Sequence, residues 1–231
     1  MNLAKLYLKD FWALFFPKLC HACGTPLLHQ EYLICTSCIY QLPFTNYHLD
    51  HENKLVKQFW GKVNVKSASA YLFFSKEGKV QKLMHQLKYN NHPEIGIELG
   101  KMYGKVLKST PKYQNLDAII PVPLHPDKQR KRGYNQSEQF AIGLSESLGI
   151  PVINNILKRI KSSDSQIFMK RESRFLNMRS VFESRHKDSL PLSVLLVDDT
   201  ITTGATLEAC VIALENAGIQ DIRIAGIAFA S

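Results

Sequence analysis

The segment that most restricts the fold of this chain is VLLVDDTITTGAT, which runs from Val194 to Thr206. Its four consecutive apolar residues predict a strand over 194–197 that is buried on both faces, as strands of parallel sheets are. The apolar spacing after the turn predicts a helix over 206–217, with Gly218 as its C-terminal stop. A buried strand, a polar turn and a helix form the repeating unit of a parallel α/β sheet.

The rest of the chain supports this fold class. The elements that we expect are strands over 68–74, 116–122, 150–157 and 222–229 and helices over 79–88, 94–108 and 135–148. Strands that alternate with helices predict an α/β domain in which helices flank a parallel sheet. Ligands of such sheets bind at the carboxyl ends of the strands. The segment after 194–197 is therefore the expected ligand site.

The turn in this segment has the residue types that bind a ribose 5-phosphate. Asp198 and Asp199 can accept hydrogen bonds from ribose hydroxyls or hold a magnesium ion. Gly204 allows close backbone approach, and the helix N-terminus and threonine hydroxyls can donate to a phosphate. The simpler alternative is an ordinary strand end with a threonine cap, since Asp and Thr are preferred there in any protein. The residues predicted to bind phosphoribosyl pyrophosphate (PRPP) are Asp198, Asp199, Thr200, Thr202, Thr203, Gly204, Ala205 and Thr206.

Four of the five cysteines fall into two matched pairs near the N-terminus. Cys20-x-x-Cys23 and Cys35-x-x-Cys38 are separated by eleven residues, a spacing close to that of zinc ribbons. A redox site needs only one such pair, so we expect four thiolates around a structural Zn²⁺. Such a module can bind nucleic acid or protein, or act only as a structural staple. The aromatic residues expected to provide surface beside it are Phe44, Tyr47, Phe59 and Trp60.

The first segment, 3–16, is apolar and aromatic but carries Lys5, Lys9 and Asp10. It is too short and too charged to span a bilayer, which needs about 20 apolar residues. We expect an amphipathic helix that packs on the protein or a partner, with attachment to a membrane surface as the alternative. No transmembrane segment is expected, and the expected location is cytoplasmic. The predicted domains are a zinc-ribbon module over 1–60, with this helix, and a second domain over 61–231.

Positive charge is concentrated between the predicted strands. The segment 157–187 holds nine Lys and Arg against three Asp and Glu, a balance of 9 − 3 = +6 in a chain of net charge +9. Such a density suits an oligophosphate or a nucleic-acid backbone. The alternative is a basic loop that only faces water. At this length, the segment is typical of a functional loop.

Several motifs occur together in a characteristic order. They are the two Cys-x-x-Cys pairs, Leu87-Lys88-Tyr89, Pro121-Val122-Pro123, Arg132-Gly133-Tyr134-Asn135-Gln136, Gln166, Arg174-x-x-Asn177 and the Asp-Asp loop. Over nearly the whole chain this order resembles the ComF family, whose members are also named GntX-like. The resemblance implies a type I phosphoribosyltransferase-like domain, an N-terminal zinc ribbon and a role in DNA uptake during natural transformation.

The resemblance also implies further site residues. In type I enzymes a turn after the first strand binds pyrophosphate, and a flexible loop closes over it. The residues assigned in this way are Pro123, Leu124, His125 and Arg132 in the turn and Arg159, Gln166, Arg174 and Asn177 in the loop. Magnesium is the implied partner of PRPP.

The sequence assigns no catalytic residue. Purine-salvage relatives carry an Asp at the position of Thr202, and Thr cannot act as a general acid or base near neutral pH. The loop is closer to the orotate type. One predicted function is a transferase that displaces pyrophosphate from PRPP with an unidentified nitrogen nucleophile. The other is a non-enzymatic component of DNA uptake that binds single-stranded DNA and a competence helicase.

Overall fold

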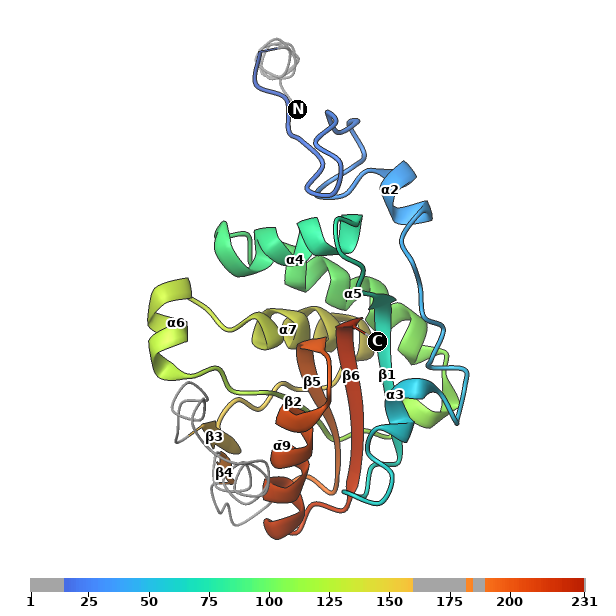
Figure 1. Cartoon of the computed structure of the whole chain (residues 1–231), viewed down its shortest axis with the longest axis vertical. Coiled ribbons are helices and arrows are strands. Elements are labelled where there is room, and N and C mark those ends of the chain that lie inside the picture. Colours follow the sequence, from blue (N-terminus) through green and yellow to red (C-terminus); the bar gives the residue numbers. More distant parts are fainter. Residues whose placement is uncertain (1–14, 160–181, 185–189, 231) are drawn as a thin grey trace.

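The computed structural model describes residues 15–159, 182–184 and 190–230. Its centre is a four-stranded sheet with the order β1-β6-β5-β2, in which all neighbours are parallel (Figure 1). The strands are β1 (Ser67–Phe73), β2 (Ala118–Pro121), β5 (Ser193–Ile201) and β6 (Asp221–Phe229). A parallel bridge joins Ile119 to Val152, where the sequence predicts a strand over 150–157. The parallel α/β architecture is confirmed.

Helices cover both faces of this sheet (Figure 1). One face carries α4 (Lys79–Tyr89), α5 (Glu94–Lys108) and α7 (Gln136–Leu148), and the other carries α3 (Lys54–Lys57) and α9 (Ala205–Asn216). Alternate residues of β5 serve the two cores: Leu195 belongs to the first, and Val194 and Leu196 belong to the second. All three side chains are fully buried. The apolar run in β5 is therefore explained by burial on two faces rather than one.

Two glycines allow α5 and α7 to pack at very short range. A Cβ on Gly100 would collide with the carbonyl oxygen of Phe140, and one on Gly143 would collide with that of Ile97. Neither helix could keep this position with a larger residue at the contact. The close packing fixes the start of α7, which lies beside the end of β5. There Asn135 caps α7 by accepting a hydrogen bond from the Ser137 backbone N–H at 3.1 Å.

The prediction that the central strand ends at Val197 is wrong. β5 continues to Ile201, because Asp198, Thr200 and Ile201 still pair with β6. The acidic pair therefore belongs to the strand itself and does not lie in the turn after it. This gives the two carboxylates a more rigid backbone than a loop would.

Some elements were not expected from the sequence. The structure has a helix α6 (Pro126–Arg132), a one-turn helix η1 (Pro111–Tyr113) and an antiparallel pair of short strands, β3 (Leu157–Arg159) and β4 (Phe182–Ser184). β3 and β4 lie within the long basic segment predicted as a loop. Most of that segment, and nearly all of the helix predicted over 3–16, fall outside the described residues.

The cysteine module shares its core with the sheet domain. Buried residues from Cys20 to Leu42 join α4, α5 and β1 in one continuous apolar cluster. The module contains α2 (Thr36–Tyr40), and after it Phe44 forms an antiparallel bridge to Leu72 of β1. The division of the chain between residues 60 and 61 stays a prediction. None of the helices in the described part of the chain is both long and apolar enough to cross a lipid bilayer.

Candidate functional site

The predicted ribose phosphate residues lie together where β5 leads into α9. All of them except Asp199 line a small cavity of about 40 Å³. Its walls are Asp198, Thr200, Ile201, Thr202, Thr203, Gly204, Ala205, Thr206 and Leu207. Gly204 has φ 73°, a left-handed conformation that glycine adopts at little cost, and it caps α9. The backbone N–H groups of the first helical turn lack intrahelical acceptors and can bind an anion.

The two carboxylates next to this cavity differ in their surroundings. Asp198 accepts hydrogen bonds from the Ser137 hydroxyl at 2.9 Å and from the Asp199 backbone N–H at 2.8 Å. Burial, and then the charge of Asp199, raise the pKa of Asp198 to about 7. Ser137 and Lys88 oppose this shift but do not cancel it. In the free protein, Asp198 therefore keeps its proton up to near neutral pH.

This pKa predicts how stability depends on pH. Because the pKa of Asp198 rises from 3.8 to about 7 on folding, the folded state holds a proton that the unfolded state releases from about pH 4 upward. The contribution of Asp198 to the free energy of unfolding therefore falls as the pH rises from about 4 to about 7, and it is constant at higher pH. In Asp198→Asn this loss disappears, so the variant should gain stability relative to wild type between about pH 5 and about pH 8. Urea unfolding at both pH values measures the difference. A pH-independent difference would contradict the assignment.

Lys88 joins the acidic pair from the other side of the site. Its Nζ lies 3.1 Å from Asp199 Oδ1 and 2.9 Å from Thr200 Oγ1. Sequence reasoning did not assign Lys88 to the site, although it noted the motif Leu87-Lys88-Tyr89. The contact joins residues 112 positions apart, and spacing along the chain cannot reveal such a pair. Ser137 was missed for the same reason.

The segment before β1 covers the turn at Gly204. A Cβ on Gly204 would lie 3.1 Å from the Phe59 ring and 3.3 Å from Gln58 Oε1. The prediction that Phe59 provides exposed aromatic surface is wrong, because its side chain is buried in the second core. Gln58 Oε1 is buried and has no hydrogen-bond partner among the described residues. Residues 58 and 59 thus add an apolar wall and a polar atom that the sequence did not indicate.

The turn predicted to bind pyrophosphate lies between β2 and α6. Pro123, Leu124 and His125 are partly exposed there, and His125 caps α6 by accepting a hydrogen bond from the Asp127 N–H at 3.3 Å. Arg132, at the end of α6, lies over the ring of Tyr89, 5.4 Å from its centroid. It also lines a cavity of about 540 Å³ with Lys88, Tyr89, Asn91, Lys128, Arg130, Lys131 and Gly133. Of the four predicted residues, Arg132 is the one in this basic cavity.

The flexible-loop residues can be located only in part. Arg159 ends β3, with its guanidinium 5.4 Å from the centroid of the Phe182 ring in β4. Gln166, Arg174 and Asn177 lie outside the described residues. Their roles in binding, like those of the residues above, stay predictions.

The four paired cysteines converge on one point. Sγ atoms of Cys20, Cys23, Cys35 and Cys38 all lie within 4.8 Å of one another. Cys23 and Cys35 are 3.8 Å apart, the spacing of about 3.8 Å expected for thiolates at about 2.3 Å from a tetrahedral zinc ion. The Cys35 backbone N–H donates to Cys20 Sγ at 3.3 Å. A hydrogen bond from Thr25 lowers the pKa of Cys23 to about 6, which favours a thiolate. This donor set fits a metal ion.

Comparison with known proteins agrees with this geometry. The model of the phosphoribosyl transferase domain family matches residues 127–230, which include α6, β5, α9 and β6. Competence protein F of Haemophilus influenzae is 34% identical over 63% of this chain. The alignment spans 66% of that protein's length, slightly less than two thirds.

Two further curated relatives cover more of the chain. Competence protein ComFC of Streptococcus pneumoniae is 28% identical over 72% of this chain and 70% of its own length. The DNA utilization protein YhgH of Escherichia coli K12 is 28% identical over 83% of this chain and 88% of its own length.

Solved structures with similar folds are more distant. Adenine phosphoribosyltransferase from Leishmania tarentolae is 14% identical, with a TM-score of 0.40, over 81% of this chain and 94% of its own. Purine phosphoribosyltransferase from Pyrococcus horikoshii is 23% identical, with a TM-score of 0.36, and the match covers 58% of this chain and 73% of that protein. Values this low say nothing about the ligand, and the assignment depends on the family match and the named relatives. The chain is thus similar to the competence proteins F and ComFC and to the DNA utilization protein YhgH, and it combines a phosphoribosyltransferase-like domain with an N-terminal four-cysteine module.

Proposed function

We propose that the turn between β5 and α9 binds PRPP, or a related ribose 5-phosphate, together with magnesium. The observation that carries this proposal is the placement of a helix N-terminus and an acidic pair on one continuous strand and turn. A 5-phosphate would accept hydrogen bonds from the N–H groups and threonine hydroxyls at the start of α9. Asp198 and Asp199 would accept from the ribose hydroxyls. Phosphate and diol sites side by side match a ribose phosphate.

Lys88 gives this site a cation for the rest of the ligand. Its ammonium group already neutralises Asp199 and can turn to a pyrophosphate oxygen, because it also lines the basic cavity. Magnesium at the acidic pair would neutralise the pyrophosphate as it leaves. Hard divalent cations of this kind prefer carboxylate and phosphate oxygens.

We further propose transfer of the phosphoribosyl group. An acceptor nitrogen would attack C1 of the ribose, and the bond from C1 to pyrophosphate would break with its electron pair on the leaving oxygen. Thr202 offers no general base. Positioning of the sugar and stabilisation of the leaving group therefore supply much of the rate enhancement.

Calorimetry of the protein with PRPP, with and without Mg²⁺, tests the binding. Saturable, magnesium-dependent binding at one site per chain is expected. Release of pyrophosphate with a panel of nitrogen acceptors then tests transfer. Binding without turnover on any acceptor would refute the transferase and leave a binding protein, whereas no binding would refute both.

The basic cavity favours a second function, contact with single-stranded DNA. Five basic side chains line it, and no acidic residue does so in the part of the chain that the structure describes. Tyr89 offers a ring on which a base can stack. Relatives carry the names competence protein and DNA utilization protein, which fits such a role in DNA uptake with a helicase partner.

Salt dependence tests the DNA contact. Affinity for a single-stranded oligonucleotide should fall with salt, with a log-log slope of about −0.7 for each neutralised phosphate. Lys128→Gln combined with Lys131→Gln should make this slope shallower. Lys105→Gln with Lys108→Gln, an equal charge change on exposed residues of α5, is the matched control. If both pairs reduce the slope equally, net charge and not the cavity is responsible.

We also propose that the four cysteines hold a structural zinc ion. Four thiolate ligands close the coordination shell and leave no open position for catalysis. Such thiolates persist where cysteines stay reduced, which favours a cytoplasmic location.

A further inference from the structure

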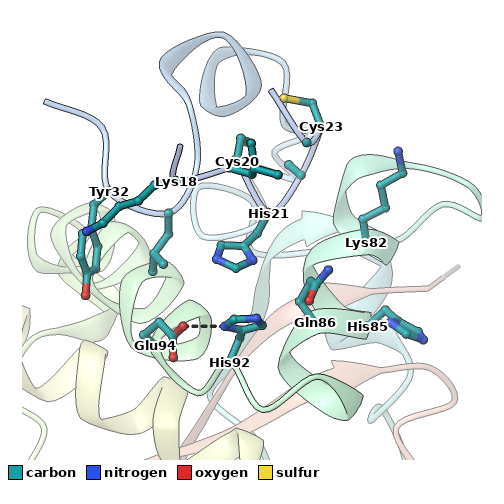
Figure 2. Close-up of a pocket in the computed structure, with 14 residues that line it drawn as sticks. Lys18, Cys20, His21, Cys23, Tyr32, Lys82, His85, Gln86, His92 and Glu94 are labelled. Carbon is teal, nitrogen blue, oxygen red and sulfur yellow. Dashed lines mark hydrogen bonds and ion pairs between the residues drawn. The ribbon is translucent and has the colours of Figure 1, made fainter. Parts of the chain in front are cut away.

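A second group of metal-binding side chains lies between the cysteine module and the sheet domain. It lines a cavity of about 820 Å³ that is bordered by the turn around Cys20 and Cys23 and by α4 (Figure 2). In the close-up, His21 projects from the module toward His92, which follows α4, and Glu94, the first residue of α5, lies beside His92. Two segments far apart in the sequence therefore supply this cluster: the turn at His21 and the connection from His92 to Glu94. His21 lies within Cys20-x-x-Cys23 but is not one of the four cysteine ligands, and the proposed PRPP site uses none of the three residues.

The three side chains are close enough to share one ion. The imidazole rings of His21 and His92 have centroids 4.4 Å apart. His92 Nδ1 lies 2.8 Å from Glu94 Oε1, and one ligand atom from each residue lies within 4.8 Å of the others. Ligands at about 2.0–2.2 Å from a tetrahedral zinc ion lie about 3.3–3.6 Å apart. His92 Nδ1 and Glu94 Oε1, at 2.8 Å, are closer than this, and no pair among the three ligand atoms exceeds 4.8 Å, so small movements of the side chains can bring all three to one ion.

We propose that His21, His92 and Glu94 form a second metal site, distinct from the four-cysteine site, that binds a divalent transition-metal ion such as Zn²⁺. Two imidazoles and one carboxylate are a common ligand set for zinc, with water in the fourth position. The ion would lie between His92 Nδ1 and Glu94 Oε1, and neutral His92 would then carry its single proton on Nε2 and remain an imidazole ligand. The hydrogen bond between His92 and Glu94 does not by itself require a third residue nearby. His21, from the cysteine module, lies within reach of both and supplies the third ligand.

This site links two parts of the chain that are far apart in sequence. His21 is next to Cys20 in the module, whereas Glu94 begins the helix that packs tightly on α7. An ion held by both sides cross-links the module to α4 and α5. It therefore stabilises the docked position of the module, because a ligand that binds only the folded arrangement shifts the equilibrium toward it.

Zinc content and thermal stability of the full chain, purified without an affinity tag, test the proposal. After equilibration with buffered Zn²⁺, wild type should bind two equivalents, and the doubly substituted His92→Asn, Glu94→Gln should bind one. The melting temperature of wild type should rise with zinc beyond the first equivalent, and that of the double variant should not. His29→Asn, at an exposed histidine of the same module, is the matched control and should behave as wild type.

Cobalt distinguishes a lost site from a misfolded module. Co²⁺ at the four cysteines gives intense thiolate-to-metal charge-transfer absorption, whereas histidine and carboxylate ligands give only weak bands. The double variant should keep the thiolate signal in full while binding one equivalent less. A single equivalent in wild type, or two equivalents in both proteins, would overturn the proposal. If the double variant loses the thiolate signal, the single variant Glu94→Gln serves as the test. If Glu94→Gln keeps the thiolate signal and still binds two equivalents of metal, the second metal site is refuted.

Discussion

Replacing Asp198 by asparagine is expected to weaken magnesium-dependent binding of PRPP by about tenfold to a hundredfold, because a hydrogen bond to a charged group contributes about 1.5–3 kcal/mol and the substitution removes that charge from the ribose contact. Asparagine keeps the shape of the side chain but has no negative charge and only one acceptor oxygen. It cannot offset the charge of a magnesium ion. Isothermal calorimetry with Mg²⁺ and PRPP at about pH 8, above the pKa of Asp198, measures the effect.

Loss of folding would not explain such a result. Since burial raises the pKa of Asp198, the neutral asparagine should leave the protein at least as stable at this pH as wild type. The matched control is Asp221→Asn, at the amino end of β6 and thus at the opposite edge of the sheet. It should bind PRPP with the wild-type dissociation constant. Equal affinities in wild type and Asp198→Asn would rule out the proposed ribose site.

Replacing Cys35 by serine is expected to release the metal ion and unfold the cysteine module. Structural zinc contributes about 10–16 kcal/mol to folding of small peptides, and a serine hydroxyl is a poor zinc ligand. The module has few buried residues of its own, so its fold depends on the ion. Metal analysis and limited proteolysis measure the two effects. Proteolytic cuts should appear within residues 15–43 in the variant and not in wild type.

The effect should reach the sheet domain as well. The buried residues of the module belong to the same apolar cluster as those of α4 and α5, so loss of the module removes part of this core. A lower melting temperature of the remaining domain is therefore expected. Cys210→Ala, at the buried fifth cysteine in α9, is the control and should keep its metal. Full zinc content in Cys35→Ser would refute the four-thiolate site.

Local patterns in the sequence were sufficient for the main elements. The helix predicted over 94–108 agrees with α5 at both ends, and the strand predicted over 222–229 differs from β6 by one residue. Periodicity and runs of apolar residues depend on neighbours along the chain, and these determine which face of an element is buried. The four-cysteine site could also be recognised from the sequence, because a metal site built from pairs of neighbouring cysteines has a characteristic spacing.

The end of β5 shows where this reasoning stops. The sequence placed the acidic pair after the strand, because the apolar run ends at Val197, but pairing with β6 extends β5 through both. The surroundings of the pair also come from distant segments: Ser137 from α7, Lys88 from α4, and Gln58 and Phe59 from the chain before β1. Burial among these segments, and then the charge of Asp199, raise the pKa of Asp198, whereas Ser137 and Lys88 lower it.

The sequence by itself thus determined the fold class, the four-cysteine cluster and the turn between β5 and α9, because each is encoded by residues close together in the chain. Only the tertiary structure decided which side chains meet the acidic pair, which basic residues line one cavity, and that His21 lies against His92 and Glu94. The physical reason is packing. Glycines in α5 and α7 let two helices approach, and a shared core docks the module on α4 and α5. Side chains that meet in this way have no common spacing in the sequence.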